Sequence, residues 1–217
     1  MDVLYLHGFA SSSQSSKAAF FSRQLRPHGI ALRTPDFNEP DFGSLTVTRM
    51  IEQVGRALGQ PGGAPAVLIG SSLGGFVAVQ AALRWPEQIG RMVLLAPAVD
   101  LHAEHMGQLG DRGLDQWKAT GKTMVFHYGF GRLMPVGYEL FADAQQYDTL
   151  NAAVDVPTLV FQGRRDSAVN PHVVEQWASA RPSVQLYMLD DDHQLLASLD
   201  YIWKEMARFL GLSASSA

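Results

Sequence analysis

The sequence predicts an α/β protein built on a doubly wound, mostly parallel sheet. Short apolar runs alternate with amphipathic segments along most of the chain, turns containing Gly or Pro separate them, and one run leads directly into Gly70-Ser71-Ser72-Leu73-Gly74. Repeated strand–helix units form a parallel sheet with helices on both faces, and such sheets bind ligands at the carboxyl ends of their strands. The 217 residues and the hydrophobic content of 47% fit a single domain with a large core.

The first part of the chain contains predicted strands over 2–6, 30–33, 66–69 and 92–96 and a predicted helix over 17–26. A second helix, over 45–58, has apolar residues at helical spacing and Ser44 as its expected N-cap. The Ala-rich helix after Ser72 ends before Trp85-Pro86, because proline stops a helix. The strand over 92–96 is almost wholly apolar, which is typical of a strand buried on both faces.

Residues 100–150 interrupt this order. They are rich in Gly, His, Met and aromatic residues and show no clean alternation of strand and helix. We interpret them as a small cap-like insertion within the single domain of residues 1–217. The order resumes with a strand over 158–162, a helix from Pro171 to residue 180, a strand over 184–189 and a last helix over 195–210.

The segment Gly70-Ser71-Ser72-Leu73-Gly74 has the pattern G-x-S-x-G between a predicted strand and a predicted helix. In a nucleophile elbow, the glycines remove side chains where strand and helix crowd together, and the central serine stands on a strained turn. The helix N-terminus behind it favours an oxyanion beside the serine. Ser72 is therefore the predicted nucleophile, with a simple helix cap as the alternative. Its neighbour Ser71 is interpreted as a local hydrogen-bonding residue.

A serine nucleophile needs an imidazole that accepts its proton and a carboxylate that orients this imidazole. His193 follows the last predicted strand, and Asp166 follows the strand before it. The chain order serine, acid, histidine is that of the α/β-hydrolases, so Ser72, Asp166 and His193 are the predicted triad. The alternatives are a solvated loop histidine, a turn aspartate, and Asp100 as the acid, since Asp100 follows the strand over 92–96.

The loop after the first strand predicts an oxyanion hole. In this fold, that loop donates one backbone N–H and the residue after the nucleophile donates the other. The expected donors are Phe9 and Leu73, and Ala10 is the alternative to Phe9.

Four stretches resemble the YqiA-like esterases, a group of compact α/β-hydrolases. These stretches are Tyr5-Leu-His-Gly-Phe-Ala-Ser-Ser-Ser-Gln-Ser-Ser-Lys17-Ala, Gly70-Ser-Ser-Leu-Gly-Gly75, Gly163-Arg-Arg-Asp166 and Asp192-His193, and the likeness covers nearly the whole chain. The resemblance implies the compact α/β-hydrolase fold. It also implies a cytoplasmic, cofactor-free serine esterase or thioesterase with Ser72, Asp166 and His193 in the triad positions.

The insertion supplies the expected substrate pocket. Trp117, Phe126 and Tyr128 are the predicted substrate-binding residues, in a segment that also contains Phe130, Met134, Tyr138 and Phe141. Pockets are mostly apolar, so this surface suits an ester or thioester of a small to medium acyl group. The alternative is that these aromatic residues only build a small core of the insertion.

Composition excludes several other functions. The net charge of −4 is spread over mixed acidic and basic residues, which argues against binding nucleic acid. The absence of cysteine excludes a thiolate nucleophile and agrees with a reducing compartment. No basic and apolar signal segment begins the chain and no apolar run is long enough to span a membrane, so a cytoplasmic location is expected.

Histidines outside the predicted triad receive no catalytic role. His102 and His105 are spaced by three residues but lack a clear third ligand, so no metal and no cofactor are expected. His28, His127 and His172 are expected to be surface or packing residues. A small serine peptidase or amidase, and a silent hydrolase fold that binds apolar ligands, are the remaining alternatives for the function.

Overall fold

A computed structural model describes residues 1–60, 62–101 and 110–212. Within these ranges, six strands form one parallel sheet in the order β2-β1-β3-β4-β7-β8. The strands are β1 (Val3–Leu6), β2 (Leu32–Arg33), β3 (Ala66–Ser71), β4 (Ile89–Leu95), β7 (Thr158–Gly163) and β8 (Val184–Leu189). The predicted doubly wound parallel sheet is confirmed.

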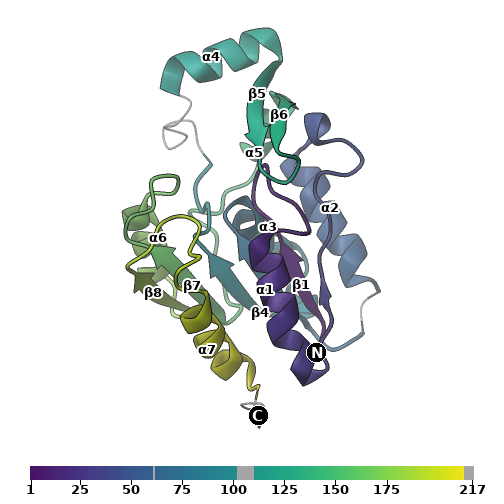
Figure 1. Cartoon of the computed structure of the whole chain (residues 1–217), viewed down its shortest axis with the longest axis vertical. Helices are drawn as coiled ribbons and strands as arrows, with labels where there is room; N and C mark the ends of the chain where they lie inside the picture. The colour runs from purple at the N-terminus through teal and green to yellow at the C-terminus, as the bar shows by residue number, and fades with distance from the viewer. Residues whose placement is uncertain (61, 102–109, 213–217) are drawn as a thin grey trace.

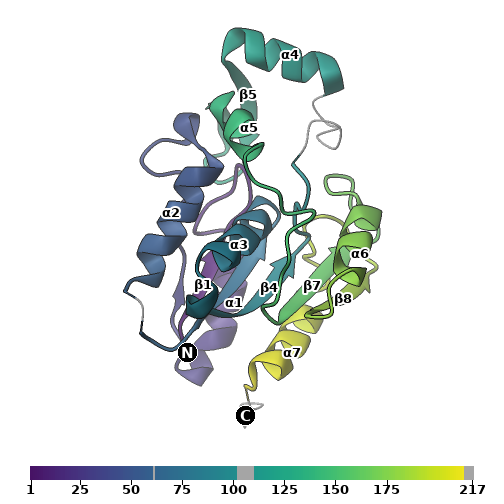
Figure 2. The same ribbon diagram turned by 180° about the vertical axis from the view of Figure 1, so that it is seen from behind.

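Helices cover both faces of this sheet (Figures 1 and 2). One face carries α1 (Ser16–Leu25) and α7 (Leu199–Leu210), and the other carries α2 (Val47–Leu58), α3 (Leu73–Arg84) and α6 (Pro171–Ser179). Side chains of β1 alternate between the two resulting cores: Val3 and Tyr5 pack with α1 and α7, and Leu4 and Leu6 pack with α2 and α3. Because both faces are buried, these strands are continuous apolar runs in the sequence.

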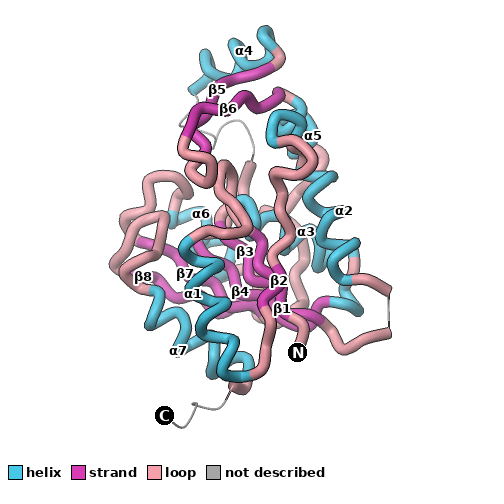
Figure 3. Tube along the Cα trace, turned by 45° about the vertical axis from the view of Figure 1, so that its right-hand side comes forward, coloured by secondary structure: helices cyan, strands magenta, loops and turns pink. Residues whose placement is uncertain are grey.

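Residues 110–144, between β4 and β7, form a separate layer beyond the sheet (Figure 3). It contains α4 (Gly110–Thr120), the antiparallel strands β5 (Lys122–His127) and β6 (Arg132–Gly137), and α5 (Glu139–Ala144). We call residues 110–144 the cap. The β5–β6 hairpin was not predicted, because the exposed Met124 and Phe126 are as apolar as the half-buried Val125, which hides the alternation of a strand.

Two helix starts differ from the prediction. Ser44 ends a short 3-10 turn (Phe42–Ser44), and α2 is capped by Thr46, whose side chain accepts a hydrogen bond of 3.2 Å from the Arg49 N–H. The last helix begins at Leu199 rather than at residue 195, because Leu195 has a positive φ of 54° and belongs to the turn that follows His193. Two further 3-10 turns cover Arg26–His28 and Pro86–Gln88. In the described ranges, no helix combines the length and apolar character needed to cross a membrane.

Candidate active site

Ser72 occupies a strained turn between β3 and α3. Its backbone has φ 53° and ψ −118°, which few residues with a side chain adopt. A Cβ atom at Gly74 would overlap the Leu6 carbonyl, and a Cβ atom at Gly70 would overlap the Gly74 carbonyl. Gly70 is needed because the end of β3 packs against the first turn of α3, and Gly74 is needed because that turn packs against the end of β1.

Strands β7 and β8 bring Asp166 and His193 to the serine. His193 Nε2 lies 3.2 Å from Ser72 Oγ, and His193 Nδ1 lies 2.8 Å from Asp166 Oδ2. Burial by itself raises the pKa of Asp166, but hydrogen bonds from His193, Val169 and Gln162 outweigh it and hold this pKa below its usual value. The Asp166 carboxylate is therefore charged at neutral pH. It selects the tautomer with the proton on Nδ1, which leaves Nε2 free to accept a proton from Ser72.

The Asp166 carboxylate is held from several directions. Its Oδ1 accepts hydrogen bonds of 2.8 Å from the N–H groups of Ala168 and Val169. Its Oδ2 accepts a further bond of 2.8 Å from Gln162 Nε2, besides the one from His193. Its side chain is fully buried. The position of the carboxylate is thus fixed before any substrate binds.

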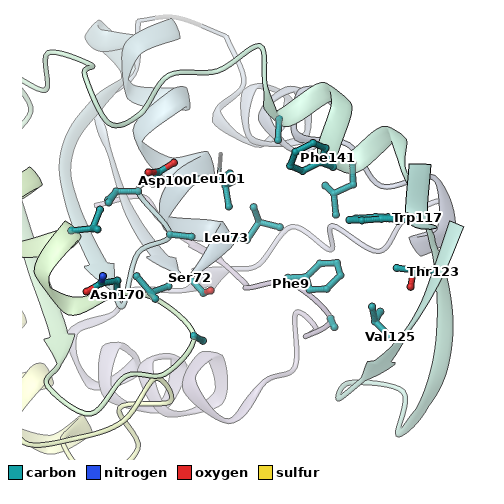
Figure 4. Close-up of a pocket in the computed structure, with 18 of the residues that line it drawn as sticks. Phe9, Ser72, Leu73, Asp100, Leu101, Trp117, Thr123, Val125, Phe141 and Asn170 are labelled. Carbon is teal, nitrogen blue, oxygen red and sulfur yellow. The ribbon is translucent and has the colours of Figure 1, made fainter. Parts of the chain in front are cut away.

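Asp100, the alternative acid, occupies a different place. It lies on the chain after β4 and lines the cavity in front of Ser72 (Figure 4). The carboxylate that contacts His193 is that of Asp166.

The loop after β1 passes directly beside the serine. A Cβ atom at Gly8 would lie 3.3 Å from the Ser72 Cβ, and Phe9, Ala10 and Leu73 line the same cavity as Ser72. Leu73 is the first residue of α3, where backbone N–H groups have no acceptor within the helix. The assignment of Phe9 and Leu73 as oxyanion donors, with Ala10 as the alternative to Phe9, stays a prediction.

A buried polar network fixes this loop to the cap. The Tyr128 N–H donates to the Ala10 carbonyl at 2.8 Å, and Asn38 Nδ2 donates to the Ser11 carbonyl at 2.9 Å. His127 Nε2 contacts Asn38 Oδ1 at 2.9 Å, and the Phe130 N–H donates to His127 Nδ1 at 3.2 Å. The proton of His127 therefore lies on Nε2. Burial is the main cause that lowers the pKa of His127, so the ring stays neutral.

His127 is a buried packing residue, which agrees with the expectation of a surface or packing residue, but its hydrogen bond to Asn38 was not predicted. The contact joins residues 89 positions apart, and neither residue belongs to a recognisable motif. The sequence signal for His127 is its position among the inward-facing residues of β5. Because β5 was not predicted, this signal could not be used.

Between the cap and the sheet lies a cavity of about 670 Å³ that Ser72 lines (Figure 4). Trp117, Phe126 and Tyr128 all line it. Trp117 is buried and its Nε1 donates to the Val136 carbonyl at 3.0 Å, so it is both a wall of the cavity and part of the cap core. Phe126 and Tyr128 are 48% and 78% exposed, which places them where the cavity meets the surface.

His102 and His105, which were expected to bind no metal, lie outside the described residues. In the ranges that the structure describes, no three His, Asp or Glu side chains are grouped so that they could hold a metal ion.

Comparison with known proteins identifies the group to which these features belong. The family model described as "Uncharacterised protein family (UPF0227)" matches residues 2–210. The chain is 22% identical over 209 residues to the palmitoyl-protein thioesterase ABHD10, mitochondrial, of Bos taurus, covering 91% of this chain and 68% of the relative.

Two solved structures show the same fold. The α/β hydrolase domain-containing protein 10 from mouse superposes with a TM-score of 0.79 at 20% identity, over 97% of this chain and 89% of that one. Est1E from Butyrivibrio proteoclasticus superposes with a TM-score of 0.76 at 18% identity, over 96% of this chain and 86% of that one. These likenesses establish the α/β-hydrolase fold that the sequence predicted.

Proposed function

The chain belongs to the uncharacterised protein family UPF0227 and has the α/β-hydrolase fold, and we propose that it hydrolyses carboxylic esters or thioesters of small to medium acyl groups. The observation that supports this proposal most directly is the continuous chain of hydrogen bonds from Asp166 through His193 to Ser72 on its strained turn. A relative that is 22% identical and is named as a palmitoyl-protein thioesterase agrees with this chemistry.

The proposed reaction proceeds in two acyl transfers. Ser72 Oγ gives its proton to His193 Nε2 and attacks the substrate carbonyl, and the N–H groups of Phe9 and Leu73 donate to the oxyanion. His193 then protonates the departing alcohol or thiol as its bond to the acyl carbon breaks. A water molecule deprotonated by His193 attacks the acyl-enzyme, releases the carboxylic acid and restores Ser72. Every proton passes through His193, so no cofactor enters the scheme.

The cavity supports an apolar acyl group as the substrate. Its volume of about 670 Å³ falls in the range of small-molecule sites, and Phe9, Leu101, Val125 and Phe141 supply apolar surface to its wall. Because Ser72 lies on the wall of this cavity, an acyl chain that extends toward the cap keeps its carbonyl beside the nucleophile.

The decisive experiment tests Ser72 against its neighbour. We expect a fluorophosphonate probe to label the wild-type protein, and Ser72→Ala to abolish both labelling and hydrolysis of p-nitrophenyl acetate, since loss of a serine nucleophile costs about a millionfold in turnover. Ser71→Ala is the matched control and should retain most activity. Near wild-type turnover of folded Ser72→Ala would refute the assignment.

A substrate panel separates the alternatives. Parallel assays with acyl esters, acyl thioesters and peptides rank the three reaction classes, and faster cleavage of peptides would make the protein a peptidase or amidase. A wild-type protein that neither reacts with the probe nor turns over any substrate would instead be a ligand-binding member of the fold.

A further inference from the structure

Lys17 is a buried lysine beside the proposed catalytic residues. It lies in the first turn of α1, is only 7% exposed, and points its ammonium toward the loop that follows β8. Lysine is almost never fully buried unless its charge is paired. Neighbouring groups must therefore pair with the charge of Lys17 to stabilise its burial.

The ammonium joins α1 to the histidine loop. Lys17 Nζ donates a hydrogen bond of 3.1 Å to the carbonyl of Gln194, the residue directly after His193. The start of α1 is fixed in turn, because the Ser15 side chain accepts a bond of 3.3 Å from the Ala18 N–H. A rigid helix end thus holds the backbone of the loop that presents the imidazole.

Acidic groups surround the same ammonium. The carboxylates that interact with its charge are Asp166, from the loop after β7, and Asp192 and Asp191, from the loop after β8. Negative charges near an imidazole favour its protonated form, which cannot accept a proton from serine. A cation buried among them opposes this effect.

We propose that Lys17 is a positioning residue of this hydrolase, which holds the His193 loop through the Gln194 carbonyl and balances the carboxylates around the imidazole. The proposal rests on the proposed function, because it assigns Lys17 a part in the same reaction. Lys17 touches neither substrate nor the reacting atoms, and it acts through the position and charge state of His193.

The charge of Lys17 is sensitive to mildly alkaline pH. Burial lowers the pKa of Lys17 to about 8, and the attraction of Asp166, Asp192 and Asp191 offsets only part of that shift. The ammonium is therefore charged at pH 7 and loses its proton in the range where most lysines stay charged. Activity should decline above pH 8 as the loop loses its cationic partner.

The test compares Lys17→Met with wild type and with Lys204→Met, which removes an exposed lysine from α7. We expect Lys17→Met to lower kcat by about 10- to 100-fold on a short p-nitrophenyl ester with KM nearly unchanged, since small displacements of a catalytic group have effects of this size. The acid limb of its pH profile should move to higher pH by about half a unit or more. Lys204→Met should match wild type in both.

A second variant separates charge from packing. Lys17→Arg keeps a positive charge at all accessible pH values, so its alkaline decline should disappear or move well above pH 8. Folded Lys17→Met with kcat within about threefold of wild type and an unchanged acid limb would overturn the proposal. If Lys17→Met does not fold, the pH dependence of kcat decides. The proposal is overturned if wild type shows no decline in kcat up to pH 9.5, or if Lys17→Arg shows the same decline as wild type.

Probe labelling distinguishes the failure of this inference from the failure of the proposed function. A wild-type protein that a fluorophosphonate does not label at Ser72 contradicts the function itself. If wild type is labelled and Lys17→Met is labelled at the same rate across pH 5 to 9, the function stands and only the role of Lys17 is refuted.

Discussion

Replacement of Asp166 by asparagine exchanges one heavy atom of the site, so it removes the negative charge while the shape of the side chain is kept. Asp166 Oδ1 accepts from two backbone N–H groups, whereas Oδ2 faces Gln162 Nε2 and His193 Nδ1. The new NH₂ group must therefore turn away from the backbone donors and toward Gln162 and His193. Gln162 can flip its amide to accept from it: within the described part of the chain Gln162 Oε1 is buried without a partner, and the flip gives up the 3.2 Å bond from Nε2 to the Gly163 carbonyl. The fold should tolerate the change.

His193 cannot adapt to the asparagine without losing the tautomer that catalysis needs. Facing an NH₂ donor, its Nδ1 must become an acceptor, so the ring proton moves to Nε2 and points at Ser72. Such a tautomer cannot accept the serine proton. Loss of the correct tautomer with preserved geometry costs about ten-thousandfold in turnover, which corresponds to about 5.5 kcal/mol of transition-state stabilisation.

The assay measures kcat and kcat/KM on p-nitrophenyl acetate together with the melting temperature of each variant. Asp100→Asn is the matched control, because it makes the same change in the carboxylate that lines the cavity, and it should retain most activity. The reasoning fails if folded Asp166→Asn keeps more than about a tenth of wild-type kcat. A greater loss in Asp100→Asn than in Asp166→Asn would move the acid to Asp100.

The remaining predictions concern the cavity and the polar network. Phe126→Ala truncates a half-exposed residue of the cavity wall, and it should change the ranking of acyl chain lengths with little loss of stability. A uniform loss of activity over all chain lengths would contradict this role of Phe126. Trp117→Ala removes a buried side chain of the cap core and should lower the free energy of unfolding by about 3 to 5 kcal/mol. Asn38→Ala removes the side-chain partner of His127 Nε2 and of the Ser11 carbonyl, and should lower both the free energy of unfolding, by about 1 to 3 kcal/mol, and kcat. Unfolding in urea and steady-state kinetics measure the two effects, and an unchanged kcat would show that the network does not affect catalysis.

Prediction from sequence succeeded where the signal is local. Buried strands β3 and β4 contain the uninterrupted apolar runs 66–69 and 92–95, and the turn around Ser72 needs glycines within a five-residue pattern, so both can be recognised without knowledge of their partners. The approach of Asp166 and His193 to Ser72 could be anticipated because parallel strands end at one edge of the sheet.

Features that depend on distant contacts were not predictable. The bond from Lys17 to the Gln194 carbonyl spans 177 positions, and nothing near Lys17 distinguishes it from a solvated lysine at a helix start. The choice of Thr46 over Ser44 as the cap of α2 follows from how the preceding 3-10 turn packs, since both residues are good caps by type. The cap hairpin has exposed apolar residues, so its strands show no alternation of apolar and polar residues.

In the sheet, strand β4 lies between the strand that precedes Ser72 and the strands that precede Asp166 and His193, and β4 itself precedes none of these residues. Ser72 follows β3, Asp166 and His193 follow β7 and β8, and β4 pairs between β3 and β7. The hydrogen-bonded chain can therefore form only after β4 has paired along both edges and the last strands have joined. Contacts between residues as far apart as the 121 positions from Ser72 to His193 form late in folding, after local helices. Recovery of hydrolysis after dilution from denaturant would accordingly time the completion of the sheet, while circular dichroism of the helices reports earlier events.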